Sequence, residues 1–323
     1  MYRYIYGPVP SRRLGISLGV DMVPFKTCSL DCIYCECGGT NELTLERSEY
    51  YPIDGILGEL RDYLSKNPAP EYVTLSGSGE PTLNSGIGRL IELFKAEYPS
   101  VPVAVLTNGT LLDRAEVRAE LMNSDVVLPS LDSACAGGFG KIDRPDNKLD
   151  LDAIIDGIVL FRDEYKQKDP AKQIWLEVFI VEGVNTTLEE IDALKAAIAR
   201  IRPDRVQLNS LDRPGTVDWL KAPPMSLMER LRDELDPGDG SMIVEVVLKY
   251  KRRDEIASYR RENEDLILES VARRPLTTRD IHDITGMHVH EIEKYLDVLV
   301  HDKKVKPVIG ERGVFYQTVS EGK

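Results

Sequence analysis

Three cysteines stand close together near the N-terminus, in the sequence CSLDCIYC, with three residues between the first two and two between the last two. Thiolates at this spacing can surround one 4Fe-4S cluster, which ordinarily takes four thiolate ligands. Cys28, Cys32 and Cys35 would therefore leave one iron open to a ligand from outside the chain. The spacing predicts a cluster that binds an exogenous ligand at that iron.

Cys37 leaves an alternative open, because the run CSLDCIYCEC offers four sulfurs that could hold a structural zinc ion or a cluster with four thiolate ligands. The fifth cysteine of the chain is Cys135. Cys37 and Cys135 together are too few to hold an auxiliary cluster. Five cysteines, four of them within positions 28–37, are a poor disulfide framework. We therefore expect metal binding in a reducing compartment and a cytoplasmic protein.

Two further polar motifs follow predicted strands. The sequence SGSGEPTLN contains Gly79, Glu80 and Pro81, and exposed glycine amides beside a carboxylate suit an ammonium ligand. The sequence LPSLDS contains Ser130 and Asp132, whose hydroxyl and carboxylate are natural partners for sugar hydroxyls. Structural alternatives stay open for both motifs, a strand-to-helix turn for the first and a helix cap for the second.

The elements that must position these residues follow a regular pattern. From about Gly15 to Ser210, short β-branched apolar runs alternate with longer helical periodicities, as in a parallel α/β sheet. Strands are predicted at residues 16–22, 72–75, 103–106, 126–128, 174–180 and 205–208. Six repeats are fewer than the eight that close a TIM barrel, so we expect an α/β fold, a partial open (β/α)6 barrel with its site at the carboxyl ends of the strands.

Taken in order, the cysteine loop after the first strand, Tyr34 just before its last cysteine, SGSGEP and LPSLDS resemble the radical SAM (S-adenosylmethionine) superfamily. Gly79, Glu80 and Pro81 match that family's Gly-Gly-Glu-Pro motif, which receives the methionine amino group, and Ser78 departs at its first glycine. The resemblance implies one 4Fe-4S cluster that reductively cleaves S-adenosylmethionine to a 5′-deoxyadenosyl radical, which abstracts hydrogen from a substrate. It also implies a reduced electron donor such as ferredoxin or flavodoxin.

The resemblance assigns roles to particular residues. The positions expected to bind S-adenosylmethionine are Tyr34, Gly79, Glu80, Pro81, Asn108, Ser130, Asp132, Val206, Gln207 and Leu208. The positions expected to face substrate are Arg12, Arg13, Asn209 and Arg213. Arg12, Arg13 and Lys26 could instead neutralise a negatively charged cluster, and we favour that role for Lys26.

The opening GPVPSRRLGISLGVDMVPFKTCSLDCIYCE is similar to the wyosine-synthase-like group of this superfamily, over roughly the first two-thirds of the chain. The archaeal wyosine synthases carry extra cysteines before the radical motif, and this sequence has none before Cys28. Three substrate classes therefore remain: an RNA base, a protein or peptide, and a small metabolite. We expect a macromolecular substrate before a metabolite. A noncatalytic Fe-S redox-sensing regulator is the alternative of another class.

Three parts are expected: a barrel at 1–218, a linker region with a helix and a strand at 219–262, and a winged helix-turn-helix-like domain at 263–323. Thr277 with Asp280 resembles a capping box, and Gly286 fits a helix stop. From Glu264 onward, nine Lys or Arg residues face eleven Asp or Glu residues, and the expected recognition helix carries EIEKYLD. We therefore expect this domain to bind protein or peptide or to pack on the barrel, and we do not expect DNA binding.

All four histidines lie in this last part, so the barrel has no histidine for a Ser-His-Asp triad. The spacing of His288 and His290 does not favour metal ligation, and we expect helix capping or solvent exposure for them. The net charge of −13 argues against a protein that coats nucleic acid. No run of about 18 apolar residues predicts a membrane span, and the first residues show no apolar stretch of signal-peptide length.

Overall fold

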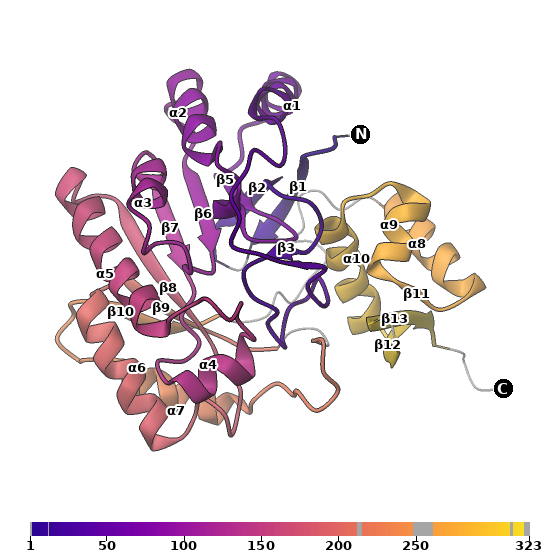
Figure 1. The fold of residues 1–323 in the computed structure, drawn as a ribbon. Helices are drawn as coiled ribbons and strands as arrows, with labels where there is room; N and C mark the ends of the chain where they lie inside the picture. The colour runs from indigo at the N-terminus through magenta and orange to yellow at the C-terminus, as the bar shows by residue number, and fades with distance from the viewer. Residues whose placement is uncertain (1, 12, 212–214, 248–260, 311–312, 320–323) are drawn as a thin grey trace.

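The computed structural model describes residues 2–11, 13–211, 215–247, 261–310 and 313–319. Its largest element is an eight-stranded sheet in the order β1-β2-β5-β6-β7-β8-β9-β10, in which β1 runs antiparallel to β2 and the other neighbours are parallel (Figure 1). The bounds are β1 Ile5–Ser11, β2 Gly15–Asp21, β5 Tyr72–Ser76, β6 Val103–Thr107, β7 Val126–Pro129, β8 Gln173–Phe179, β9 Arg205–Asn209 and β10 Ile243–Val246.

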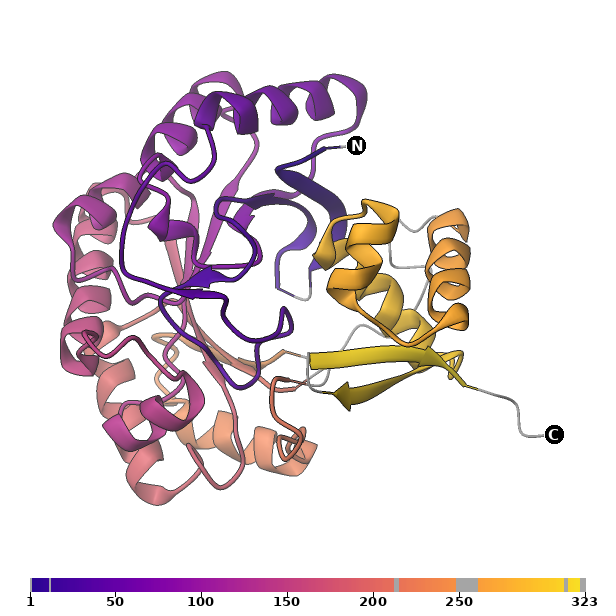
Figure 2. The same ribbon diagram turned by 45° about the vertical axis from the view of Figure 1, so that its right-hand side comes forward.

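Helices connect the parallel strands and cover one face of the curved sheet, as Figure 2 shows. They are α1 Ile53–Lys66, α2 Ile87–Glu97, α3 Ala115–Leu121, α4 Ala136–Ile142, α5 Leu151–Lys168, α6 Leu188–Ile201 and α7 Met225–Leu235. Each long helix turns an apolar stripe toward the sheet, and in α1 this stripe consists of the buried Ile53, Ile56, Leu57 and Leu60. The apolar interior between helices and sheet is the main core of the protein.

All six predicted strands are confirmed to within one residue at each end, as β2, β5, β6, β7, β8 and β9. The prediction missed β1, whose sequence IYGPVPS contains two prolines. An edge strand tolerates proline because one side of its backbone needs no partner, and β1 lies at the edge of the sheet. The expected linker region contributes α7 and β10, and β10 pairs with β9. The boundary at 218 stays a prediction.

The C-terminal part has its own small core and its own sheet. Three helices precede two paired strands, as predicted, and a short strand after the first helix was not predicted. It comprises α8 Arg261–Arg273, β11 Leu276–Thr277, α9 Thr278–Thr285, α10 Val289–His301, β12 Val305–Gly310 and β13 Gly313–Thr318. The capping box of Thr277 and Asp280 is confirmed, and Gly286 ends α9 with a φ of 71°, the left-handed conformation expected of a glycine stop.

This C-terminal part packs against β1 through α10 (Figures 1 and 2). In the cysteine loop, the short strand β3 (Thr27–Cys28) pairs in parallel with β4 (Glu42–Leu43). The ring of His288 stacks on Tyr6 with centroids 4.0 Å apart, and its Nε2 lies 2.7 Å from Oδ2 of Asp21. His288 also caps α10, because its Nδ1 accepts from the backbone N–H of His290 at 3.3 Å. Helix capping is confirmed for His288. Solvent exposure is wrong for both histidines, because both rings pack on Tyr6 of β1 and their side chains are only 13% and 20% exposed.

Among the described residues, no helix combines the length and the apolar character needed to cross a bilayer.

Truncating a side chain of the α1 stripe should lower the free energy of unfolding far more than the same truncation on an exposed helix face. Leu60→Ala removes a fully buried side chain, so the free energy of unfolding should fall by about 2–5 kcal/mol. Leu160→Ala in α5 is the matched control, because that side chain is 48% exposed, and its change should stay near about 0.5 kcal/mol. Urea denaturation followed by circular dichroism measures both, and equal losses would contradict the packing of α1.

Candidate active site

A cavity of about 350 Å³ opens inside the curve of the sheet, near the carboxyl ends of its parallel strands. The parallel strands β2, β5, β6, β7, β8 and β9 all contribute to its wall, and so does β1. Four of the parallel strands do so with their last residues: Ser76, Thr107, Phe179 and Asn209. The three cysteines predicted to hold a cluster all line this cavity. Parallel strands place their carboxyl ends at one rim, so motifs far apart in the sequence meet here.

The cysteine loop carries its three sulfurs into the cavity from one side. Cys28 ends β3, and a turn closed by the Cys35 N–H to the Cys32 carbonyl at 3.1 Å folds the rest of the loop back. Nζ of Lys26 donates to Sγ of Cys35 at 3.0 Å, and Nδ2 of Asn108 donates to Sγ of Cys28 at 3.6 Å. Three sulfurs, two of which accept from these donors, fit a negatively charged iron-sulfur cluster.

The surroundings raise the pKa of two of the three thiols and lower the pKa of the third. Burial raises the pKa of Cys28 to about 12, and it raises the pKa of Cys32 well above its ordinary value. The pKa of Cys35 is lowered to about 5, first by a hydrogen bond with Cys37 and then by the ammonium of Lys26. Metal ligands must be deprotonated, so metal binding at these cysteines will release protons, chiefly from Cys28 and Cys32.

Lys26 keeps its charge although it is only 2% exposed. Burial lowers the pKa of its ammonium, but the sulfurs of Cys35 and Cys37 outweigh burial and raise it. The contact between Lys26 and Cys35 is the one expected of a residue that neutralises a cluster.

The SGSGEP loop follows β5 and reaches the cavity with Gly79 and Glu80. A Cβ on Gly79 would run into the backbone of Thr27, so only glycine lets this loop lie against β3. Gly77 adopts a φ of +110° and leaves no room for a Cβ beside Asp21. The glycines therefore bring the loop up against the residue that precedes Cys28.

The carboxylate of Glu80 ties this loop to the loop after β6. Its Oε1 accepts from Thr82 N at 3.0 Å and from the hydroxyls of Thr82 and Thr107 at 2.6 Å each, and its Oε2 accepts from Asn108 N at 2.7 Å. Burial raises the pKa of Glu80, and these hydrogen bonds oppose the rise. Glu80 thus holds Asn108, the residue that donates to Cys28, in place.

The two candidate residues of LPSLDS differ in their position relative to the cavity. Ser130 lines the cavity, whereas Asp132 is not among the cavity-lining residues that the structure describes. Asp132 accepts from the hydroxyl of Tyr34 at 2.5 Å and from Phe179 N at 2.7 Å. The ring of Tyr34 in turn stacks on Phe179 with centroids 3.9 Å apart, and both rings face the cavity. Asp132 therefore orients an aromatic wall.

The structure brings together most of the predicted site residues. The cavity is lined by Cys28, Cys32, Cys35, Tyr34, Gly79, Glu80, Asn108, Ser130, Asn209 and Arg13. Pro81, Val206, Gln207 and Leu208 are buried and are not among the described lining residues, and Gln207 donates to Glu245 of β10 at 2.8 Å. Arg12 and Arg213 lie outside the described residues. The roles expected of all these residues stay predictions.

Sequence reasoning missed several residues of this cavity. Two of them lie in β8: Glu177, which forms an ion pair with the predicted Arg13, and Phe179, which completes the aromatic wall. The C-terminal part contributes His290, Glu293 and Lys294 to the lining. Phe179 follows Glu177 by two residues, so both lie on one face of β8 and the strand spacing could have indicated them together, but no sequence signal shows which face of α10 meets the barrel.

Comparison with known proteins identifies the superfamily. Residues 22–191 match the radical SAM superfamily. The chain is 31% identical to the UPF0026 protein MJ1312 of Methanocaldococcus jannaschii over 82% of this chain and 81% of that protein. It is also 33% identical over 305 residues to a protein of Brachyspira hyodysenteriae named GTPase Obg, and it spans only 44% of that protein's length.

The fold has a solved counterpart. A radical SAM methyltransferase from Sphaerobacter thermophilus superposes with a TM-score of 0.53 at 16% identity, over 75% of this chain and 68% of that chain. The shared fold, a mixed α/β arrangement with a parallel sheet, agrees with the family match. Through its matched residues, its UPF0026 relatives and its fold, the chain belongs to the radical SAM superfamily, which implies an iron-sulfur cluster and S-adenosylmethionine.

Proposed function

We propose that this protein is a radical SAM enzyme, of the oxidoreductase or transferase type, that holds one 4Fe-4S cluster on Cys28, Cys32 and Cys35. The observation that carries the proposal is that these cysteines share one cavity with the SGSGEP loop and the ends of successive strands. When bound, the cluster supplies the electron that cleaves S-adenosylmethionine to a 5′-deoxyadenosyl radical, which takes a hydrogen atom from the substrate. A ferredoxin or flavodoxin is the proposed source of that electron.

The chain's own residues hold and shield the reactants. Lys26 and Asn108 place donors against two of the sulfurs, and Glu80 fixes Asn108. Gly79 and Glu80 offer the cavity acceptors for an ammonium group, and the Ser130 hydroxyl offers a partner for a sugar. Tyr34 and Phe179 form a flat wall on which an adenine can stack. Together they keep water from a radical, which is what such chemistry requires of a protein.

We infer that the substrate is a macromolecule, an RNA base or a protein or peptide. At about 350 Å³ the cavity lies at the lower end of the range for one small ligand, and it must also hold S-adenosylmethionine. A single base or side chain that projects from a larger molecule needs less of this space than a whole metabolite. A small metabolite is the alternative, and a noncatalytic redox sensor would have no use for the residues of SGSGEP and LPSLDS that line the same cavity as the sulfurs.

We infer a partial open (β/α)6 barrel and, at residues 263–323, a winged helix-like domain, because three helices precede the paired strands β12 and β13. The acidic balance of that domain supports binding to protein or packing on the barrel before binding to DNA. The cysteine usage supports a reducing compartment, the cytoplasm.

Loss of one cluster cysteine should abolish both iron and cleavage. Anaerobic reconstitution of the protein should give about four irons per chain, and dithionite with S-adenosylmethionine should then yield 5′-deoxyadenosine, measured by chromatography. Cys32→Ala should lose the iron and the product together, and Cys135→Ala, outside the cavity, should keep both. Bound zinc without iron in the reconstituted protein would refute the proposed chemistry.

Glu80→Gln should weaken S-adenosylmethionine binding while leaving the iron in place. The amide replaces an acceptor oxygen by a donor that faces N–H and O–H groups, so buried groups lose their partner at a cost of about 1–3 kcal/mol. We expect affinity to fall by about tenfold or more, measured by calorimetry at constant iron content. Glu229→Gln on the exposed side of α7 is the control. Unchanged affinity would mean that SGSGEP is only a turn.

A further inference from the structure

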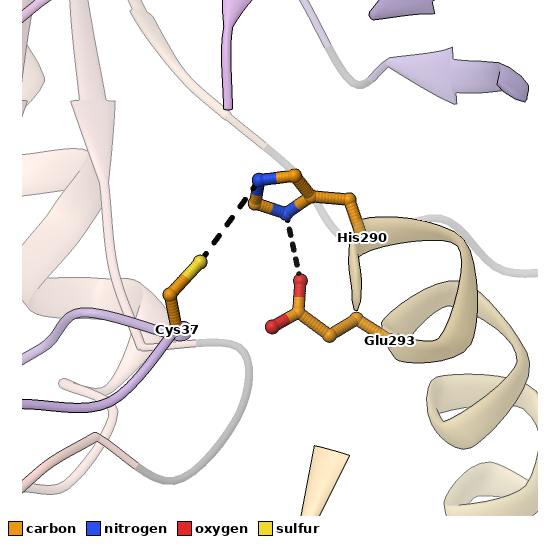
Figure 3. A group of neighbouring side chains, drawn as sticks. All are labelled: Cys37, His290 and Glu293. Carbon is orange, nitrogen blue, oxygen red and sulfur yellow. Dashed lines mark hydrogen bonds and ion pairs between the residues drawn. The ribbon is translucent and has the colours of Figure 1, made fainter. Parts of the chain in front are cut away.

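Three side chains that could bind a metal ion meet where the cysteine loop touches the C-terminal part. Cys37 comes from the loop two residues after Cys35, and His290 and Glu293 come from the first turn of α10 (Figure 3). Sγ of Cys37 lies 3.9 Å from Nε2 of His290, and Nδ1 of His290 lies 2.9 Å from Oε2 of Glu293. One ligand atom from each residue lies within 4.8 Å of the other two.

The distances suit a zinc-type ion. Zinc bonds thiolate sulfur at about 2.3 Å and imidazole nitrogen at about 2.0–2.1 Å, so two such ligands at a tetrahedral angle lie roughly 3.5 Å apart. The observed 3.9 Å between Cys37 and His290 requires an approach of a few tenths of an ångström. Glu293 follows His290 by three residues, a spacing that puts both on one helix face. That spacing within the helix, which the sequence alone shows, becomes a site only when α10 docks beside Cys37.

A plain ion pair explains only part of this arrangement. The carboxylate of Glu293 pairs with the imidazole of His290 through Oε2 and Nδ1, which lie 2.9 Å apart. That pairing accounts for the contact at Nδ1. The contact at the other ring nitrogen, Nε2, with the sulfur of Cys37 at 3.9 Å is long for a hydrogen bond, and Figure 3 shows the thiol turned toward this nitrogen. A metal ion between sulfur and nitrogen, with a carboxylate beside it, accounts for all three residues.

We propose that Cys37, His290 and Glu293 bind one divalent ion of the zinc type, distinct from the cluster, with a further coordination position open to the cavity. A thiolate and a carboxylate together balance the two positive charges of the ion, with the imidazole neutral. Three protein ligands with an open position are typical of catalytic rather than structural zinc. All three residues line the cavity that Cys28, Cys32 and Cys35 also line. The open position would take an oxygen, nitrogen or sulfur atom of the substrate, a role that rests on the proposed function, whereas binding of the ion does not.

The ion would also join the two parts of the chain. His288 already fixes α10 to Asp21, and Cys37 would add a bond between the cysteine loop and the same helix turn. Any ligand that binds only the folded state stabilises it, so zinc should raise the melting temperature of the protein.

The experiment uses the full chain with its cluster reconstituted anaerobically, titrated with Zn²⁺ or with Co²⁺ as a spectroscopic probe. We expect one zinc per chain in addition to iron, counted by mass spectrometry of the elements, and a thiolate-to-cobalt charge-transfer band. His290→Gln and Glu293→Gln should weaken zinc binding by about 100-fold or more and leave the iron count unchanged. His301→Gln, exposed at the other end of α10, and Cys135→Ser are matched controls that should bind zinc normally.

A second protein separates this proposal from the proposed cleavage chemistry. The variant with Cys28, Cys32 and Cys35 all changed to Ser has no cluster ligands left, and it should still bind one zinc that His290→Gln removes. If its folding fails by circular dichroism, the single His290→Gln variant of the reconstituted protein decides. Zinc binding that His290→Gln leaves unchanged, or no zinc beyond background in the parent protein, would overturn the site. Loss of iron in Cys37→Ser would also overturn it, because Cys37 would then be a cluster ligand.

Discussion

The geometry of the cavity depends on one buried carboxylate. Glu80 is 2% exposed, and a carboxylate so far from water is tolerated only when its oxygens accept hydrogen bonds. Its partners come from its own loop and from the loop after β6, so the two loops cannot move apart without exposing the charge. Asn108, held in this way, donates to the sulfur of Cys28. The ends of β5 and β6 and the cysteine loop therefore form one rigid unit.

A second buried carboxylate extends this unit to the C-terminal part. Asp21 accepts from the backbone N–H and hydroxyl of Ser78, at 2.8 and 3.0 Å, and its Oδ2 also faces Nε2 of His288. Ser78 stands where the family motif has a glycine, and its hydroxyl uses the same acceptor as the histidine of α10. The departure from the motif is thus coupled to the docking of the C-terminal part. A shift of α10 would disturb the loop that carries Gly79 and Glu80.

The sequence predicted the strands well because each is a short apolar run between turns, and because parallel strands buried on both faces need such runs. The cysteine spacing and the strand-end motifs predicted which residues would meet at the rim. The sequence could not predict which way a rim side chain points. Asp132 stands at the expected position, but its carboxylate turns to Tyr34 and Phe179, because partners on other elements satisfy it there.

Contacts between distant parts were beyond prediction for a different reason. The expectation that His288 and His290 would be capping or exposed considered α10 alone, where the two residues do not share a face suited to one ion. Docking against β1 places the ring of Tyr6 and the carboxylate of Asp21 beside His288, and it places the thiol of Cys37 beside His290. These partners lie more than 250 residues away along the chain, so neither periodicity nor spacing carries a trace of them.

The charged side chains gathered in this cavity serve function rather than stability. Lys26, Glu80, the pair of Arg13 and Glu177, and the pair of His290 and Glu293 all lie at or beside the cavity, while the core between helices and sheet is apolar. Buried ion pairs add little to stability, because desolvation offsets the attraction between the charges. Apolar side chains would stabilise the fold at least as well. Shifted pKa values gathered in one cleft are instead typical of sites that bind or transform charged groups, and here most of these groups line the cavity that Cys28, Cys32 and Cys35 also line.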